Sequence, residues 1–190
     1  MRVALTLSAE QGAAAAEARA AEDAGYDGVA TGEHLFFHGP VANGFITLAA
    51  AAGATSRIRL LSSLTLLPLY PAALAAKLAA TLDQVSGGRF DMGVGVGGEH
   101  PPEFVAAGVE VTQRGARADE ALDVMKRLWS GELVDFDGRF TTVPGLTLEP
   151  GPVQPGGPPL WLGGRRPATR GRCPPRRPGP RTATETLRSR

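Results

Sequence analysis

The sequence predicts an α/β fold built on a parallel sheet. Short apolar strand patterns alternate with helix patterns, and the strand patterns begin near residues 2, 27, 58 and 89. A spacing of about thirty residues is the length of one strand and helix unit. Strict alternation of the two patterns is typical of a parallel sheet covered by helices. Residues 1–164 are long enough for one substantial core, so we expect a single domain there.

The first unit has recognisable boundaries. The apolar strand 3–7 precedes Ser8 and Gln11, whose spacing predicts a capping box at the start of an alanine-rich helix. Gly25 suits the left-handed position that ends such a helix, and residues 27–31 are the second strand pattern.

The later units repeat this order. Asn43 opens a second alanine-rich helix before a strand over 57–62, and Pro71 opens an amphipathic helix before a strand over 89–94. Apolar residues at spacings of three and four then predict a helix over 114–129.

The pattern changes after this helix. Residues 134–140 alternate around Asp137 and Gly138, a strong hairpin signal. A segment rich in proline and glycine then leads to a last apolar strand, 160–162. We therefore expect four complete units, an inserted β-hairpin and a fifth parallel strand.

The formal net charge of +1 combines two different segments. Residues 165–190 contain nine arginines and one acidic residue, a charge of +8, so residues 1–164 carry −7. The tail holds five prolines and almost no apolar residues, which predicts disorder. The acidic body argues against nucleic-acid binding, and the tail is the only segment suited to an acidic partner.

The composition predicts a cytoplasmic protein without a membrane span. No apolar run approaches the roughly 18 residues that cross a bilayer, and the N-terminus lacks the apolar core of a signal peptide. The single cysteine, Cys173, argues against a disulfide framework and a cysteine metal site. The three histidines show no helical metal-binding spacing, so we expect no metal.

Candidate functional residues follow the predicted strands. Ligands of parallel α/β proteins lie at the carboxyl ends of the strands, which selects residues 31–38, 62–65 and 95–103. The first segment contains Glu33 and His34, a carboxylate and an imidazole that suit proton transfer near neutral pH. Neighbours on an extended segment face opposite ways, so we expect only one of the two to point into a pocket. On this dipeptide alone, the favoured interpretation is that both are ordinary polar loop residues.

The third segment formally matches a dinucleotide-binding fingerprint at Gly93, Gly95 and Gly98. A proline pair follows where that motif needs a helix, so a glycine-lined wall beside a flat ring, or a plain turn, is the better interpretation. Of the two acids in this segment, Glu99 is the candidate for chemistry. Glu103 is expected to be a first-turn helix acid favoured by the helix dipole.

Several segments together suggest a family. They are Ala21 to Val29, Glu33-His34, Thr55 to Leu60, Thr81 to Phe90, Gly93-Val94-Gly95, Arg117 to Trp129 and Leu160 to Gly164. On these segments the chain resembles the bacterial luciferase-like monooxygenase superfamily, which includes FMN-dependent monooxygenases and deazaflavin-dependent oxidoreductases.

The resemblance implies a (β/α)8 TIM barrel, with the hairpin as its insertion after the fourth helix. A full barrel needs about 250 residues, so we expect an incomplete barrel with about five strands and a truncated C-terminal side. The resemblance stops where the arginine-rich tail begins. We interpret residues 165–190 as an out-of-frame reading of GC-rich DNA.

The resemblance also implies site roles. His34 matches a histidine beside the reactive ring of the deazaflavin enzymes, and Glu99 matches an acid near the substrate of some sugar-phosphate dehydrogenases, so we expect both to be catalytic. Ser63 and Leu64 match a non-proline cis peptide behind the ring. The expected cofactor-binding residues are Glu33, His34, Ser63, Leu64, Thr65, Gly95 and Gly97.

The expected function is that of a flavin- or deazaflavin-dependent oxidoreductase or monooxygenase acting on a small organic substrate. Its expected cofactor is coenzyme F-420 (deazaflavin) or FMN, with a slight lean toward the deazaflavin. The alternative is a catalytically incompetent barrel remnant whose open sheet edge pairs with a partner, for example in a homo-oligomer.

Overall fold

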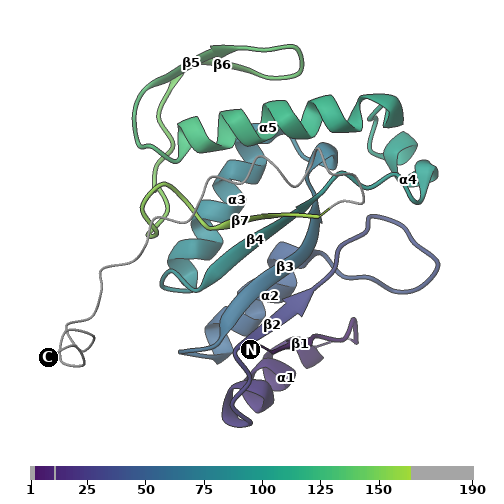
Figure 1. Cartoon of the computed structure of the whole chain (residues 1–190), viewed down its shortest axis with the longest axis vertical. Coiled ribbons are helices and arrows are strands. Elements are labelled where there is room, and N and C mark those ends of the chain that lie inside the picture. The colour runs from purple at the N-terminus through teal and green to yellow at the C-terminus, as the bar shows by residue number, and fades with distance from the viewer. Residues whose placement is uncertain (1–2, 11, 164–190) are drawn as a thin grey trace, which may run out of the picture.

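The computed structural model describes residues 3–10 and 12–163 and has the predicted parallel α/β arrangement (Figure 1). Five strands form one parallel sheet in the order β1-β2-β3-β4-β7. They are β1 (Ala4–Thr6), β2 (Gly28–Thr31), β3 (Arg59–Leu66), β4 (Phe90–Gly95) and β7 (Leu160–Leu162). The domain boundary at residue 164 and the predicted disordered tail, 165–190, lie outside the described residues.

Four helices join the strands: α1 (Ala13–Asp23), α2 (Gly44–Ala54), α3 (Ala72–Val85) and α5 (Arg114–Leu128). Neighbours in this series contact one another, α1 with α2, α2 with α3 and α3 with α5, so the helices form a continuous layer. Their buried positions are mostly alanines, which allow close approach of the helices to the sheet. The core therefore lies between this layer and the buried side chains of the strands.

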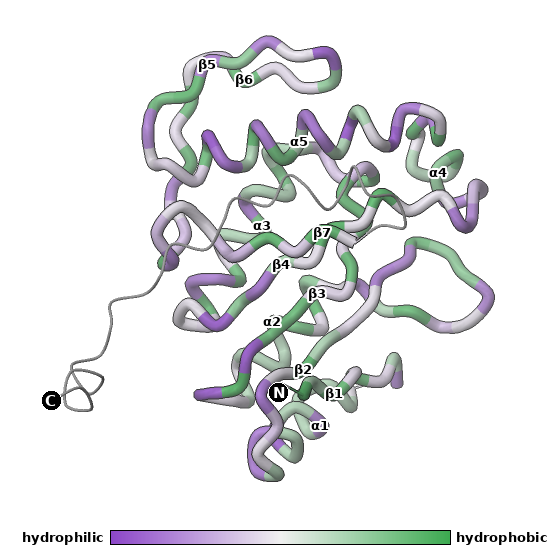
Figure 2. The backbone as a smooth tube through the Cα atoms, in the orientation of Figure 1, coloured by the Kyte–Doolittle hydropathy of each residue, from purple (hydrophilic) through white to green (hydrophobic). Residues whose placement is uncertain are grey.

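Sequence patterning explains this packing. Figure 2 shows hydrophobic residues along β3 and β4, whereas α5 alternates between hydrophilic and hydrophobic segments as an amphipathic helix does. The buried side of α5 carries Ala118, Ala121, Val124, Met125 and Leu128. The predicted helix over 114–129 is thus confirmed.

Most predicted boundaries are also confirmed. Gly25 has a φ of +81° directly after α1, and the side chain of Asn43 caps α2 by accepting a hydrogen bond from the Ile46 amide at 3.1 Å. The predicted capping box at Ser8 is wrong. The amide and hydroxyl of Ser8 instead donate to the carboxylate of Glu17, at 2.8 and 2.5 Å, and α1 begins only after Gly12.

Two predicted segments differ in extent. Residues 62–65 were expected after the third strand, but β3 continues to Leu66, and its register against β4 shifts between Ser62 and Thr65. The hairpin is present as β5 (Val134–Asp137) and β6 (Thr142–Leu146). Its turn is longer than a two-residue loop, and the carboxylate of Glu120 accepts hydrogen bonds from the amides of Arg139 and Phe140 in this turn.

The remaining elements are short. They are the 3-10 turns η1 (Leu67–Leu69) and η2 (Val111–Gln113) and the six-residue helix α4 (Pro101–Ala106). The helix α4 follows β4 through the loop that carries Glu99, and this places its first turn beside the end of the sheet (Figure 1). In the part of the chain that the structure describes, no helix is long and apolar enough to cross a membrane.

Candidate functional site

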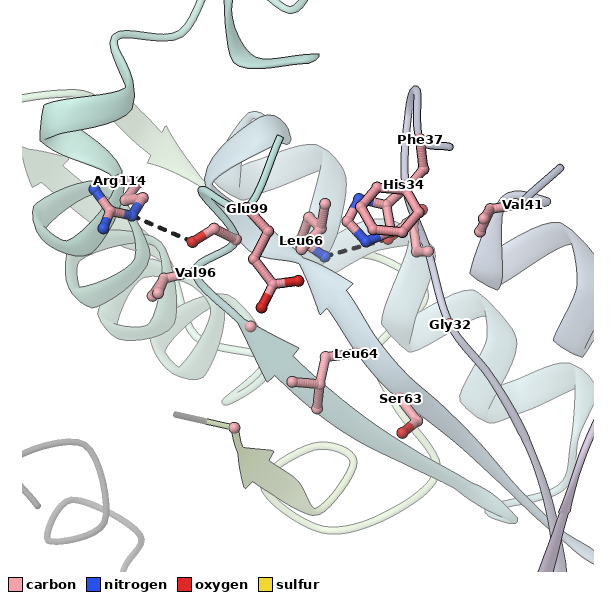
Figure 3. A pocket seen from close by; sticks show the side chains of 14 residues that line it. Gly32, His34, Phe37, Val41, Ser63, Leu64, Leu66, Val96, Glu99 and Arg114 are labelled. Carbon is pink, nitrogen blue, oxygen red and sulfur yellow. Dashed lines mark hydrogen bonds between the residues drawn. The ribbon is translucent and has the colours of Figure 1, made fainter. Parts of the chain in front are cut away.

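A cavity of about 770 Å³ lies where β2, β3 and β4 end (Figure 3). Loops from all three strands contribute to its lining, as expected for a parallel sheet. The lining residues are Gly32, Glu33, His34, Phe37, Val41, Ser63, Leu64, Leu66, Gly95, Val96, Gly97, Glu99, Arg114 and Gly163. The structure therefore brings seven of the eight predicted site residues to one place.

The β2–α2 loop supplies His34, whose side chain is 18% exposed. Its Nδ1 lies 3.2 and 3.1 Å from the two carboxylate oxygens of Glu103. The ring of Phe37 stacks on the imidazole, with centroids 4.0 Å apart and planes inclined by 16°. His34 is thus held at one edge and on one face.

Glu33 is more buried than its neighbour, with 7% exposure. Its carboxylate accepts hydrogen bonds from the hydroxyl of Tyr70, from Nδ2 of Asn43 at 2.8 Å and from the amide of Leu66 at 3.4 Å. Burial raises the pKa of Glu33, and these hydrogen bonds only partly oppose that effect. Burial and the nearby Glu33 together raise the pKa of Tyr70 as well, which keeps the phenol protonated as a donor.

The contacts of Glu103 were not predicted from the sequence. It lies in the first turn of α4 as predicted, but it is fully buried and contacts the β2–α2 loop through His34 and through the amide of Leu35 at 3.2 Å. The only feature of the sequence that could have indicated a role for Glu103 in the site was its position close after the fourth strand. The contact itself joins residues 69 positions apart, so it depends on the tertiary structure.

The peptide bond between Ser63 and Leu64 is cis, as the resemblance implied. The Leu64 side chain packs against glycines at the ends of β4 and β7. A Cβ at Gly163 would lie 2.1 Å from Leu64 Cδ1, and one at Gly95 would lie 3.2 Å from Leu64 Cβ. The glycines along this wall therefore make room for Leu64, and the wall that faces the cavity is partly apolar.

Two other predicted residues of this region occupy different environments. Gly97 has a φ of +60°, and a Cβ there would lie 3.0 Å from the ring of Phe104, so a glycine is required for backbone conformation and for packing. Thr65 is 1% exposed and is absent from the cavity lining. Its Oγ1 has no hydrogen-bond partner among residues 3–10 and 12–163.

Glu99 and Arg114 add charge to the cavity. Figure 3 shows Arg114 on the side opposite His34 and Glu99 between them in this view. The exposed Glu99 carboxylate has no hydrogen bond or ion pair within the described part of the chain. Arg114 Nε donates to the carbonyl of Gly97 at 3.2 Å, and Nη1 donates to that of Val111 at 2.9 Å. Sequence reasoning treated Arg114 only as the start of a helix.

The cavity lining combines apolar side chains with one cationic group. Leu64, Leu66 and Val96 provide the apolar surface, and the guanidinium of Arg114 keeps Nη2 without a partner among the described residues. Within those residues no group of three or more histidine, cysteine, aspartate or glutamate side chains is arranged to hold a metal ion.

Comparison with known proteins gives the family. The sequence model of the luciferase-like monooxygenase family matches residues 2–172. The chain therefore belongs to the luciferase-like monooxygenase family.

Individual relatives agree with this assignment. A Mycobacterium tuberculosis protein of uncharacterised function is 33% identical over 143 residues, which cover 75% of this chain and 49% of that protein. The oxygenase component of the flavin-dependent trigonelline monooxygenase of Acinetobacter baylyi is 31% identical over 149 residues, or 77% of this chain and 41% of its own length. The chain thus spans about half the length of these relatives.

Solved structures show the same fold. A monooxygenase from Streptomyces bottropensis superimposes with a TM-score of 0.78 and 30% identity, covering 85% of this chain and 53% of that one. An F420-dependent secondary alcohol dehydrogenase, solved with an F420-acetone adduct, gives a TM-score of 0.74 and 28% identity, covering 86% and 52%. The structural neighbours include enzymes of both cofactor types, because a 3,6-diketocamphane monooxygenase of Pseudomonas putida, 22% identical, was solved with FMN.

Proposed function

We propose that this chain is the cofactor-binding part of a flavin- or deazaflavin-dependent oxidoreductase that acts on a small organic substrate. The observation that carries the proposal is the convergence of His34, the cis Ser63-Leu64 peptide and Arg114 on one cavity at the carboxyl end of a parallel sheet. Family membership and the FMN- and F420-dependent neighbours support it.

The proposal extends to the fold. We propose that the described strands are five of the eight strands of a (β/α)8 barrel, and the sequential order of the parallel sheet and the single helix layer support this. The TM-score of 0.78 to a protein of which this chain covers 53% supports this assignment.

Each residue has a proposed part in holding the cofactor. Ser63 and Leu64 would support one face of the ring, Gly95 and Gly97 would border it, and Arg114 would pair with an anionic group such as the phosphate that FMN and coenzyme F-420 both carry. Thr65 is buried behind the cavity wall and would support Leu64 without touching the cofactor. When bound, such a cofactor supplies the hydride or oxygen chemistry, while the protein orients the ring and manages protons.

Two side chains are proposed to manage those protons. His34 lies in the cavity wall, held by Glu103 and Phe37, and would give a proton to a bound ligand or accept one from it. Glu99 has no hydrogen-bond or ion-pair partner among the described residues, and its carboxylate would exchange a proton with the substrate. Glu33 is held by Tyr70 and Asn43 and would support the loop beneath the ligand.

Titration of the purified chain with FMN and with coenzyme F-420, followed by fluorescence quenching and thermal unfolding, tests the proposal. We expect saturable quenching and a raised melting temperature with one of the two cofactors. Absence of both effects at millimolar concentrations of either cofactor would contradict the proposal and favour a barrel remnant without cofactor. The preferred cofactor would also indicate which branch of the family the chain follows.

A further inference from the structure

We propose that Glu103 is a positioning residue that fixes His34 in the tautomer with the proton on Nδ1, which leaves Nε2 as the ring nitrogen that can accept a proton. The inference rests on the proposed function only for its catalytic consequence. The tautomer itself is a property of this chain without any ligand.

The distances carry the first step. Both carboxylate oxygens of Glu103 lie within 3.2 Å of His34 Nδ1. The amide of Leu35 donates to Oε2 of the same group at 3.2 Å. A backbone amide can only donate, so the carboxylate accepts from Leu35, and both of its oxygens can accept from His34 as well when Nδ1 carries the proton.

Burial carries the second step. Glu103 is 0% exposed, so water does not compete for its oxygens and its contacts are those of the protein. The carboxylate reaches from α4 across to the β2–α2 loop and contacts two consecutive residues there, His34 and Leu35. It therefore fixes both the loop backbone and the ring edge.

The face of the ring is fixed independently. The ring of Phe37 stacks on the imidazole at 4.0 Å, and Phe37 lies on the same loop as His34. With Nδ1 bound at one edge and one face covered, rotation of the imidazole would break both contacts. Carboxylates that bind one nitrogen of a histidine set which nitrogen carries the proton and raise the basicity of the other.

A purely structural role for Glu103 predicts something different. A side chain that only fills space and binds the Leu35 amide would leave the tautomer of His34 to its intrinsic preference, which for a free neutral imidazole favours the proton on Nε2. The two roles therefore differ in a spectroscopic property that does not depend on catalysis.

The experiment is nitrogen-15 NMR of the chain with labelled histidine. Protonated and unprotonated ring nitrogens have well separated shifts, and comparison with His34→Gln assigns the signals of His34 among the three histidines. Glu103→Leu removes the acceptor while keeping volume, and Glu103→Gln keeps shape but removes the charge. Glu132→Gln is the matched control, because the exposed Glu132 side chain makes no hydrogen bond or ion pair within the described residues.

We expect the Nδ1-protonated form in the wild type and in Glu132→Gln, and a shift toward the Nε2-protonated form in Glu103→Leu. In Glu103→Gln the proton NMR resonance of the Nδ1 hydrogen should move upfield, because a neutral acceptor replaces a carboxylate. A wild-type His34 protonated on Nε2, or a folded Glu103→Leu with unchanged tautomer, would overturn the proposal. If Glu103→Leu does not fold, an unchanged proton resonance in Glu103→Gln overturns it instead.

These outcomes separate the inference from the proposed function. Failure to bind either cofactor would contradict the function and leave the tautomer result standing. An unchanged tautomer with normal cofactor binding would contradict only the role of Glu103.

Discussion

Tyr70 donates its hydroxyl proton to the buried carboxylate of Glu33, and Nδ2 of Asn43 donates to both, at 2.9 Å to the Tyr70 oxygen and 2.8 Å to the Glu33 oxygen. This cluster ties the β2–α2 loop to the start of α2 and to the segment before α3. It places a carboxyl group with a raised pKa in the cavity wall, directly before His34 in the sequence.

The raised pKa of Glu33 predicts a pH-dependent stability difference. A carboxyl whose pKa is higher in the folded state binds more protons there, so its contribution is fully present below the unfolded pKa, near 4.5, and is lost as pH rises through the folded pKa. We therefore expect the free energy of unfolding of the wild type to fall relative to that of Glu33→Gln as pH rises from about 4.5 through the folded pKa. Urea unfolding of both proteins over a pH series measures the difference, and parallel profiles would contradict it.

Glu22 predicts the opposite sign. Hydrogen bonds from the amides of Ile58 and Arg57 lower the pKa of Glu22 to about 2. Its contribution is therefore present above the unfolded pKa, near 4.5, and is lost as pH falls toward 2. Glu22→Gln should have a lower melting temperature than wild type at pH 7, and the two should converge in acid. If the two melting temperatures differed by the same amount at every pH, the hydrogen bonds from these amides would not depend on the charge of Glu22.

Gly93 should tolerate no side chain. A Cβ there would lie 2.1 Å from the carbonyl oxygen of Ser62, which belongs to the backbone of the adjacent strand. Gly93→Ala should lower the free energy of unfolding by about 1–3 kcal/mol. Gly115→Ala is the control, because its Cβ on α5 would meet nothing within 4 Å, and it should stabilise the chain by roughly 0.5–1 kcal/mol. Chemical denaturation checks both, and equal effects would refute this explanation.

Arg114 should distinguish a phosphorylated ligand from one without phosphate. If Nη2 pairs with the cofactor phosphate, Arg114→Ala should weaken FMN binding about 10- to 100-fold and leave riboflavin binding nearly unchanged, because a hydrogen bond to a charged group contributes about 1.5–3 kcal/mol. Arg127→Ala is the control, since Arg127 pairs with Asp123 on the exposed side of α5. Equal weakening of both ligands would place the phosphate elsewhere.

His34→Ala should reduce turnover about 10²- to 10⁴-fold in a form of the enzyme that is active. It should also lower the melting temperature, because the buried carboxylate of Glu103 would keep only its hydrogen bond from the Leu35 amide. The matched control is His38→Ala, an exposed histidine four positions later. Steady-state kinetics and thermal unfolding measure the two effects. Wild-type turnover in His34→Ala would exclude the proton-transfer role.

Local signals determined much of the fold. The alternation of strand and helix patterns, the caps at Gly25 and Asn43 and the hairpin are short-range features, and all appear in the structure. The turn of the hairpin is longer than the Asp-Gly pair, because Asp137 is the last residue of β5. The predicted capping box at Ser8 was wrong because Glu17, nine positions further along the chain, accepts hydrogen bonds from both the amide and the hydroxyl of Ser8.

The sequence by itself determined the parallel α/β class and the candidate loops. Through the resemblance it also predicted the cis peptide at Ser63-Leu64, which the structure contains, and named His34 as a site residue. Only the tertiary structure decided what those residues touch. The partners of His34 and Leu64, namely Glu103 and Gly163, lie 69 and 99 positions further along the chain. No local periodicity encodes such contacts, because they arise when parallel strands bring the ends of separate units to one edge of the sheet.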